Sequence, residues 1–273
     1  MERSTRGIDY QEVPRPVAVL VDEYPPRFVD PPHSHRRAQL LYACSGVISL
    51  ITEDATFTIP PQRAVWIPPG VVHEAHTMSA VSLRTLYVDA PTQKRMPPVC
   101  RVLEVSNLLR ELILAAAQLP VEYETTSREG RIMDLILDEL SESARAAPLL
   151  ELQTPMPRDP RLVRICRQIL QEPDAPDSID DYADAAGMAR RTFTRTFRRE
   201  TGISFNAWRL HVRLTGALSR LTTGASITEV AFEVGYNSPS AFTAMFKRAF
   251  GVAPTHYFAT PAAEPEPRAE IVL

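Results

Sequence analysis

The sequence has few of the residues on which disulfide-bonded, thiolate-ligated or membrane-spanning folds depend. Only three of its 273 residues are cysteines, and Cys44, Cys100 and Cys166 lie far apart, with no Cys-x-x-Cys pair. This spacing argues against a disulfide framework and a thiolate zinc site. No stretch approaches the ~20 apolar residues of a membrane-spanning helix, and no N-terminal segment has the apolar region of a signal peptide. We therefore expect a cytoplasmic protein with no membrane partner.

The chain as a whole also lacks a net excess of basic residues, although its C-terminal part has one. The whole sequence has 30 Lys and Arg against 33 Asp and Glu. Residues 158–251 hold 14 basic against 10 acidic residues, whereas the rest of the chain holds 16 against 23. A length of 273 residues is enough for two domains. The charge distribution therefore indicates a basic C-terminal domain that could contact phosphate.

The same helix-turn-helix pattern occurs twice in this basic half. Each copy has a serine, an alanine, a turn glycine and two phenylalanines in the same order: Ser178, Ala183, Gly187, Phe193 and Phe197, then Ser226, Ala231, Gly235, Phe242 and Phe246. The pattern predicts a short helix, a glycine at positive φ, and a second helix anchored by phenylalanines four residues apart. A helix from about 205 to 221 would join the copies. Two copies in register are far more specific than one.

The second helix of each copy is the candidate DNA-reading element. Arginine dominates the first, and its planar guanidinium can pair with guanine or bind phosphate. The second copy has fewer long donors, with Ala244 at the position that matches Arg195, so we expect it to hold the DNA backbone more than it reads bases. The candidate DNA-binding residues are Arg190, Arg191, Thr194, Arg195 and Arg198 in the first copy, and Asn237, Ser238, Ser240, Thr243 and Lys247 in the second.

Three short motifs carry a resemblance to a known family. They are Phe-Arg-Arg-Glu-Thr-Gly at 197–202, Val-Ala-Phe-Glu-Val-Gly-Tyr at 230–236, and Phe-Lys-Arg-Ala-Phe-Gly-Val-Ala-Pro at 246–254. With them, residues 161–257 resemble the DNA-binding domain of the AraC/XylS family of transcription regulators. The resemblance implies sequence-specific binding of double-stranded DNA, with RNA polymerase as a candidate partner. It places base-facing positions at Arg191, Thr194, Arg195, Asn237 and Ser240. Ala244 departs from the family, whose members often carry arginine there.

The N-terminal part reads as short strands followed by two helices. Apolar segments separated by turn residues, at 39–42, 47–51, 56–59, 64–67 and 83–88, predict a small antiparallel barrel. Apolar stripes then run from Val102 and Val105 to Ala116, and from Ile132 to Leu140. These stripes predict a helical hairpin that covers an open barrel face or pairs with its copy in a homodimer.

Histidines in the strand region resemble the two sequence motifs of the cupin barrel. In metal-binding cupins, the ligand positions would fall on His33, His35, Gln39 and His73, with glutamate usual where Gln39 stands. A neutral set of three imidazoles and an amide suits a divalent transition metal such as Zn, Fe, Ni or Cu. The alternative is a barrel without metal whose histidines bind an effector by hydrogen bonds. Candidate walls of the effector pocket are Arg37, Tyr42, Trp66 and His76.

These expectations combine into an α+β chain. The predicted parts are a cupin-like antiparallel β-barrel (1–98), a helical hairpin (99–147), a proline-rich linker (148–160), an all-α double helix-turn-helix (161–260) and a disordered tail (261–273). The predicted function is a DNA-binding transcription regulator, not an enzyme, that responds to a small-molecule effector and acts as a homodimer. The alternatives are a metal-dependent cupin dioxygenase or isomerase fused to a DNA-binding domain, and an architectural DNA binder with a purely structural barrel.

Overall fold

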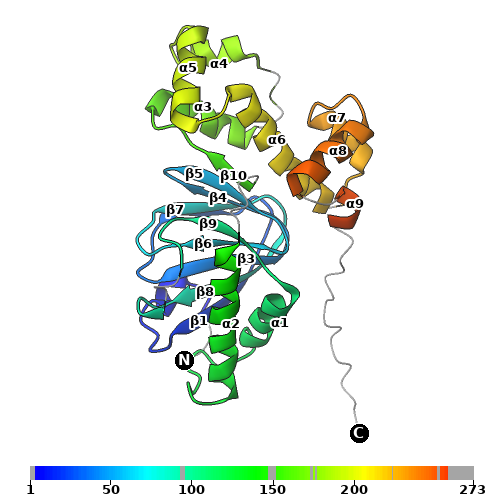
Figure 1. The fold of residues 1–273 in the computed structure, drawn as a ribbon. Coiled ribbons are helices and arrows are strands. Elements are labelled where there is room, and N and C mark those ends of the chain that lie inside the picture. The colour runs from blue at the N-terminus through cyan, green and yellow to red at the C-terminus, as the bar shows by residue number, and fades with distance from the viewer. Residues whose placement is uncertain are drawn as a thin grey trace.

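The computed structural model describes residues 4–92, 96–146, 152–172, 175, 177–222, 224–250 and 253–257. Strands dominate residues 17–104 and helices dominate residues 107–257 (Figure 1), which confirms the α+β class. The tail predicted at 261–273 lies outside the described residues. No helix in the described part of the chain is long and apolar enough to cross a membrane.

Ten described strands form two antiparallel sheets, which confirms the predicted barrel-like domain. Sheet A has the order β1 (Val17–Tyr24), β8 (Val81–Val88), β3 (Ala38–Ser45), β6 (Arg63–Ile67) and β9 (Arg101–Glu104). Sheet B has the order β10 (Gln153–Pro155), β5 (Ala55–Ile59), β4 (Ile48–Thr52), β7 (His73–Thr77) and β2 (Val29–His33). Every strand segment predicted from the sequence overlaps one of these strands. The inner faces of the two sheets enclose an apolar core.

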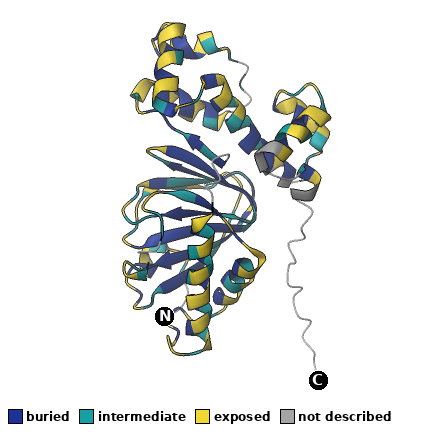
Figure 2. Cartoon of the chain, viewed as in Figure 1, coloured by how far each residue is buried: buried dark blue, intermediate teal, exposed yellow. Residues whose placement is uncertain are grey.

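Sheet A is covered on both faces, so most positions of its central strand β3 are apolar. Along β3, Leu41 faces the barrel interior, whereas Leu40 and Tyr42 face outward into a second apolar cluster. The hairpin of α1 (Asn107–Ala116) and α2 (Arg128–Arg145) covers this outer face, as Figure 1 shows. Figure 2 shows that the side of α2 that faces away from sheet A is exposed to solvent.

One predicted helix boundary is wrong. Val102 and Val105 were expected in the first helical stripe, but Val102 lies in β9 and pairs with Val65 of β6. The first helix begins later, where Ser106 accepts a hydrogen bond from the Leu109 N–H as its N-cap. β-Branched valines suit the pleated strand, and a serine cap defines the helix start better than apolar spacing does.

The C-terminal half contains the predicted repeat. The helices are α3 (Pro160–Gln171), α4 (Ile179–Ala185), α5 (Arg190–Thr201), α6 (Phe205–Thr222), α7 (Ile227–Glu233), α8 (Pro239–Phe250) and α9 (Pro254–Tyr257). Ser178 and Ser226 cap α4 and α7 in equivalent capping boxes. Gly187 and Gly235 have φ values of 63° and 85° in the turns. Both copies therefore use the local signals expected from the sequence, and α6 joins them.

The predicted linker contains structure of its own. Residues 153–155 form β10, which adds an antiparallel edge strand to β5, with Thr154 opposite Thr56. Proline is compatible with this position because an edge strand does not need every N–H for pairing. The first part of the linker, up to residue 151, lies outside the described residues.

Candidate functional site

The exposed face of α5 carries the first group of candidate DNA-binding residues. Phe193 and Phe197 are fully buried against the core of their own motif, which directs Arg191, Arg195 and Arg198 to solvent. Among the described residues, these three arginines form no ion pair. Arg190 differs, since its guanidinium lies 3.0 Å from the Asp180 carboxylate. The Thr194 hydroxyl donates to the Arg190 carbonyl, 3.0 Å away.

The second group is placed around the start of α8. Asn237, Ser240 and Lys247 are exposed and Thr243 is half-buried, while Phe242 and Phe246 fill the core. Ser238 has a structural task, because its hydroxyl accepts the Ala241 N–H as a helix cap, 3.2 Å away. This surface has a single long cationic donor among the predicted residues, Lys247, against four arginines in the first group.

A cavity of about 520 Å³ occupies the interior of the barrel, a volume typical of small-ligand sites. Its walls come from both sheets and from the N-terminal segment that includes η1 (Gly7–Tyr10). Aromatic rings of Tyr24 and Phe28 stack on one another 4.4 Å apart, and both line the cavity. The Gln39 Oε1 and Thr85 Oγ1 atoms are buried without a protein hydrogen-bond partner. The cavity therefore offers apolar contact and free polar atoms to a ligand.

Three of the four predicted metal ligands form one cluster, and two of them, His33 and His35, line this cavity. The ring nitrogens of His33, His35 and His73 lie within 4.8 Å of one another. His33 is at the end of β2 opposite His73 of β7, whereas His35 lies in the following loop. The Nδ1 atoms of His33 and His73 can donate to the carbonyls of Pro31 and Val71, at 2.7 and 2.9 Å. With each Nδ1 donating, each Nε2 is an acceptor, and the Nε2 of His33 lies 3.2 Å from the Nε2 of His35, within hydrogen-bond distance.

The surroundings of His35 and His73 favour neutral imidazoles. Burial lowers the pKa of His35 to about 4, and it lowers the pKa of His73 to about 4 as well. Neutral imidazole is the form that binds metals or accepts hydrogen bonds. Gln39 is almost fully buried beside His35, so its unpartnered oxygen could complete a set of three nitrogens and one oxygen. The residues present therefore fit a divalent transition metal.

None of the four residues predicted as walls of the effector pocket lines this cavity. Tyr42 and Trp66 face the helical hairpin, because they lie on the outer side of sheet A. The Arg37 guanidinium donates to the carbonyls of Val13 and Arg15, 2.6 and 2.8 Å away, and so holds the N-terminal segment. His76 faces α3 and α6 across a different cavity, on the outer side of sheet B.

The cavity has other walls that the sequence did not identify. Asp30 lies 3.7 Å from His33, and burial raises the pKa of this carboxyl above its usual value. Tyr87 contacts His35, with ring centroids 5.1 Å apart. A side chain at Gly7 would collide with the Tyr87 hydroxyl, so this glycine permits the N-terminal segment to approach the cavity. The alternation of apolar and polar residues in β8 was the available signal for Thr85 and Tyr87.

A ligand-binding barrel joined to two helix-turn-helix motifs defines a ligand-responsive DNA-binding regulator. Comparisons agree with this class. A family model described as an AraC-like ligand binding domain matches residues 16–140, and a helix-turn-helix domain model matches residues 182–260. The HTH-type transcriptional regulator NimR of Escherichia coli (strain K12) is 32% identical over 258 residues, which cover 92% of this chain and 93% of that protein. The chain belongs to the AraC family of HTH-type transcriptional regulators.

Other relatives match in part or more weakly. The HTH-type transcriptional regulator MtrA of Neisseria gonorrhoeae is 36% identical over 101 residues, covering 37% of this chain and 34% of that protein. Among solved structures, ToxT from Vibrio cholerae aligns with 89% of this chain and 98% of its own, at 11% identity and a TM-score of 0.37.

The contrast between Arg195 and Arg190 leads to a prediction about DNA reading. Replacing Arg195 by alanine should weaken binding to the native site by ~1–3 kcal/mol and relax the preference at one base pair. Arg190→Ala is the matched control, because this arginine is already paired with Asp180 and should affect sequence preference less. Gel shifts on specific and random duplexes measure both effects. Equal losses on the two duplexes would identify Arg195 as a phosphate contact.

Proposed function

We propose that this regulator binds its operator through α5 and α8, and that a small molecule in the barrel cavity changes that binding. The observation that carries the proposal is a roomy cavity with unpartnered buried polar atoms in the same chain as two exposed recognition surfaces. The regulator would act in the cytoplasm on double-stranded DNA, with RNA polymerase as a further partner. The full-length relative is a transcription regulator, which supports a role without catalysis over a fused cupin enzyme.

The length of α6 supports binding of both motifs to one face of the duplex. Its 18 residues span roughly 27 Å at 1.5 Å per residue. With part of a motif on either side, α5 and α8 could reach successive major-groove segments ~34 Å apart. One chain would then occupy a non-palindromic half-site, with most base reading by the arginine-rich α5.

The proposal predicts an effector response that depends on the barrel cavity. Operators are first selected from genomic fragments with the full chain, and a metabolite panel is then screened for compounds that raise the melting temperature. Such a compound should change operator affinity by ~5–150-fold. Thr85→Val, which removes an unpartnered hydroxyl from the cavity, should reduce the response. Thr56→Val is the control, because that unpartnered hydroxyl lies outside the barrel cavity.

Two results would contradict this proposal. One is a stabilising compound whose effect on operator affinity is unchanged in Thr85→Val and lost in Thr56→Val, which would place the effector outside the barrel. The other is operator binding that no stabilising compound alters, which would leave an architectural DNA binder with a structural barrel.

We further propose that His33, His35, His73 and Gln39 hold a divalent transition metal. The support is the closeness of the three ring nitrogens, the carbonyl contacts that orient His33 and His73, and the unpartnered Gln39 oxygen. A metal there would act as a Lewis acid that binds an anionic or carbonyl group of the effector. Without a metal, the same atoms would bind the effector by hydrogen bonds.

The metal proposal predicts near-stoichiometric transition metal in protein purified without a His tag or added metal. His35→Ala should remove the metal, because it deletes one of three nitrogen ligands. His76→Ala should retain it, because that ring lies on the other side of sheet B. Elemental analysis measures each content. Substoichiometric metal that is the same in all three proteins would leave the hydrogen-bonding site as the correct account.

We also propose that the hairpin forms a homodimer interface. Leu109, Ile113 and Ile136 are buried against sheet A, whereas Leu108 and Leu135 remain 50% and 41% exposed on the same two helices. A second copy of the chain would cover these leucines through an isologous contact. Dimerisation would also bring two bipartite DNA-binding domains to tandem half-sites and increase affinity through effective concentration.

The dimer proposal predicts a mass of about twice the 30.5 kDa of the chain by light scattering. A Leu108→Ser, Leu135→Ser double variant should shift the protein to the monomer mass, because both changes lie on the exposed side of the hairpin. Val29→Ser and Val72→Ser, at exposed valines of the barrel, form the control and should leave the mass unchanged. Wild-type protein that stays monomeric at tens of micromolar, with and without DNA, would assign the hairpin a structural role.

A further inference from the structure

Strand β10 belongs to the effector-domain sheet. It pairs with β5, with Gln153 opposite Phe57 and Thr154 opposite Thr56. The Met156 N–H extends the pairing by donating to the Asp54 carbonyl, 2.9 Å away. The opposite edge of the same sheet is β2, which carries His33 at the barrel cavity. The segment expected as a linker is therefore continuous with the sheet that helps to form the cavity.

The same segment is also bound by the first helix-turn-helix motif. The Pro155 carbonyl accepts a hydrogen bond from the indole Nε1 of Trp208, 2.8 Å away. Trp208 is fully buried and packs edge-to-face on Phe197 of α5, with ring centroids 5.9 Å apart. Met156 lies in the core of this motif, whereas Leu152 lies in the barrel core. Residues 152–156 thus contribute to two hydrophobic cores at once.

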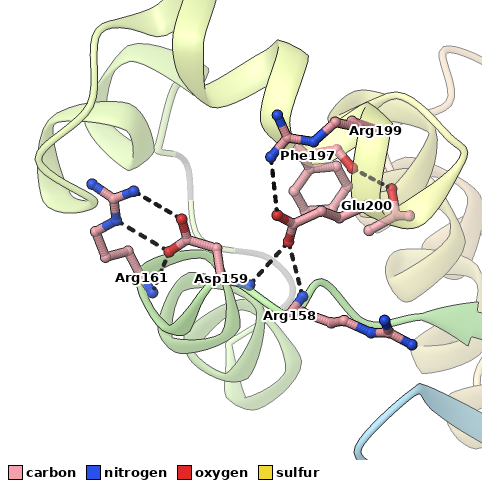
Figure 3. Close-up of polar contacts among 7 residues, drawn as sticks. Arg158, Asp159, Arg161, Phe197, Arg199 and Glu200 are labelled. Atoms are coloured by element: carbon pink, nitrogen blue, oxygen red, sulfur yellow. Dashed lines mark hydrogen bonds and ion pairs between the residues drawn. The ribbon is translucent and has the colours of Figure 1, made fainter.

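Glu200, near the C-terminal end of α5, makes the second connection. Its Oε2 atom accepts the backbone N–H groups of both Arg158 and Asp159 at 2.9 Å, as Figure 3 shows. Burial acts to raise the pKa of this carboxyl, but the two backbone donors and Arg199 lower it below its usual value. Asp159 is itself the N-cap of α3. An ionised carboxylate therefore ties the recognition helix to the residues that follow β10.

We infer that Glu200 is a positioning residue that couples β10 to α5, so that pairing of β10 with β5 and placement of α5 change together. The inference rests on the proposed role of α5 in DNA binding. β10 is a three-residue edge strand that pairs with β5 alone, and short edge strands can open locally without unfolding of the sheet. Trp208 and Glu200 hold its C-terminal side to the first motif, so detachment from β5 would release this motif from the barrel. A change in sheet B would thereby alter the presentation of α5 to DNA.

Hydrogen exchange of the full chain tests the coupling without operator or effector, so its outcome is independent of the experiments on effector response. Glu200→Ala should raise exchange of amides in 153–159 and in β5 by about tenfold or more, because it removes two hydrogen bonds to a charged group. Glu200→Gln should raise it less, since the amide keeps an acceptor oxygen. The matched control is Asp181→Asn, where a carboxylate accepts the Ser178 N–H at 2.7 Å in the same motif without contact to the linker. Its effect should remain within α4.

Hydrogen exchange of the β5 amides distinguishes coupling of β10 to α5 from a local effect of Glu200 on the start of α3. If Glu200→Ala raises exchange in α3 and α5 but leaves β5 and 153–156 unchanged, Glu200 only stabilises the start of α3 and the inference is wrong. If that variant does not fold, Trp208→Phe provides the second test, because it keeps an aromatic ring in the core and removes the N–H that donates to the Pro155 carbonyl. Trp208→Phe should raise exchange in 153–156 and β5. No rise in either segment would overturn the inference.

Discussion

The two-residue alternation of side chains along the strands of sheet A is the constraint on which the effector domain depends. It sends Gln39, Leu41 and Thr85 to the barrel interior, while Leu40 and Tyr42 support the helical hairpin. Both faces of sheet A are covered, so a polar atom on its inner face is shielded from bulk solvent. Such an atom is stable without a protein hydrogen-bond partner only where a ligand, metal or water can reach it. A shift of one residue in β3 would exchange the two faces and remove both the cavity and the hairpin support.

The same alternation explains which parts of the site could be predicted. The double motif was predictable because its signals are local: Ser178 and Ser226 cap helices, and Gly187 and Gly235 adopt positive φ. The histidine cluster followed from the resemblance to cupins, although His35 lies in a loop and not on the strand. Tyr42 and Trp66 were misplaced because a strand that is apolar on both faces gives no signal for which face meets the cavity.

The remaining errors concern segments whose structure depends on distant partners. Val102 lies in a strand because β9 pairs with the free edge of β6. In the same way, β10 forms by pairing with the edge of β5. Neither partner is visible in the local sequence. Arginine is a residue type that often binds ligands, yet the Arg37 guanidinium donates hydrogen bonds to the carbonyls of Val13 and Arg15. A buried arginine needs several acceptors, and backbone carbonyls of the N-terminal segment supply them.

The position of sheet B gives the two domains a common element. Its β2 edge helps to form the histidine cluster, and its β10 edge is bound by Trp208 and followed by the residues that Glu200 holds. The cavity above this sheet is lined by polar residues such as Ser49 and Thr58 together with apolar ones such as Ile51, Leu170 and Val212, from sheet B, α3 and α6. A ligand that moves β2 and β7 in the cavity would therefore act on a sheet whose far edge, β10, is bound by Trp208 of the DNA-binding half.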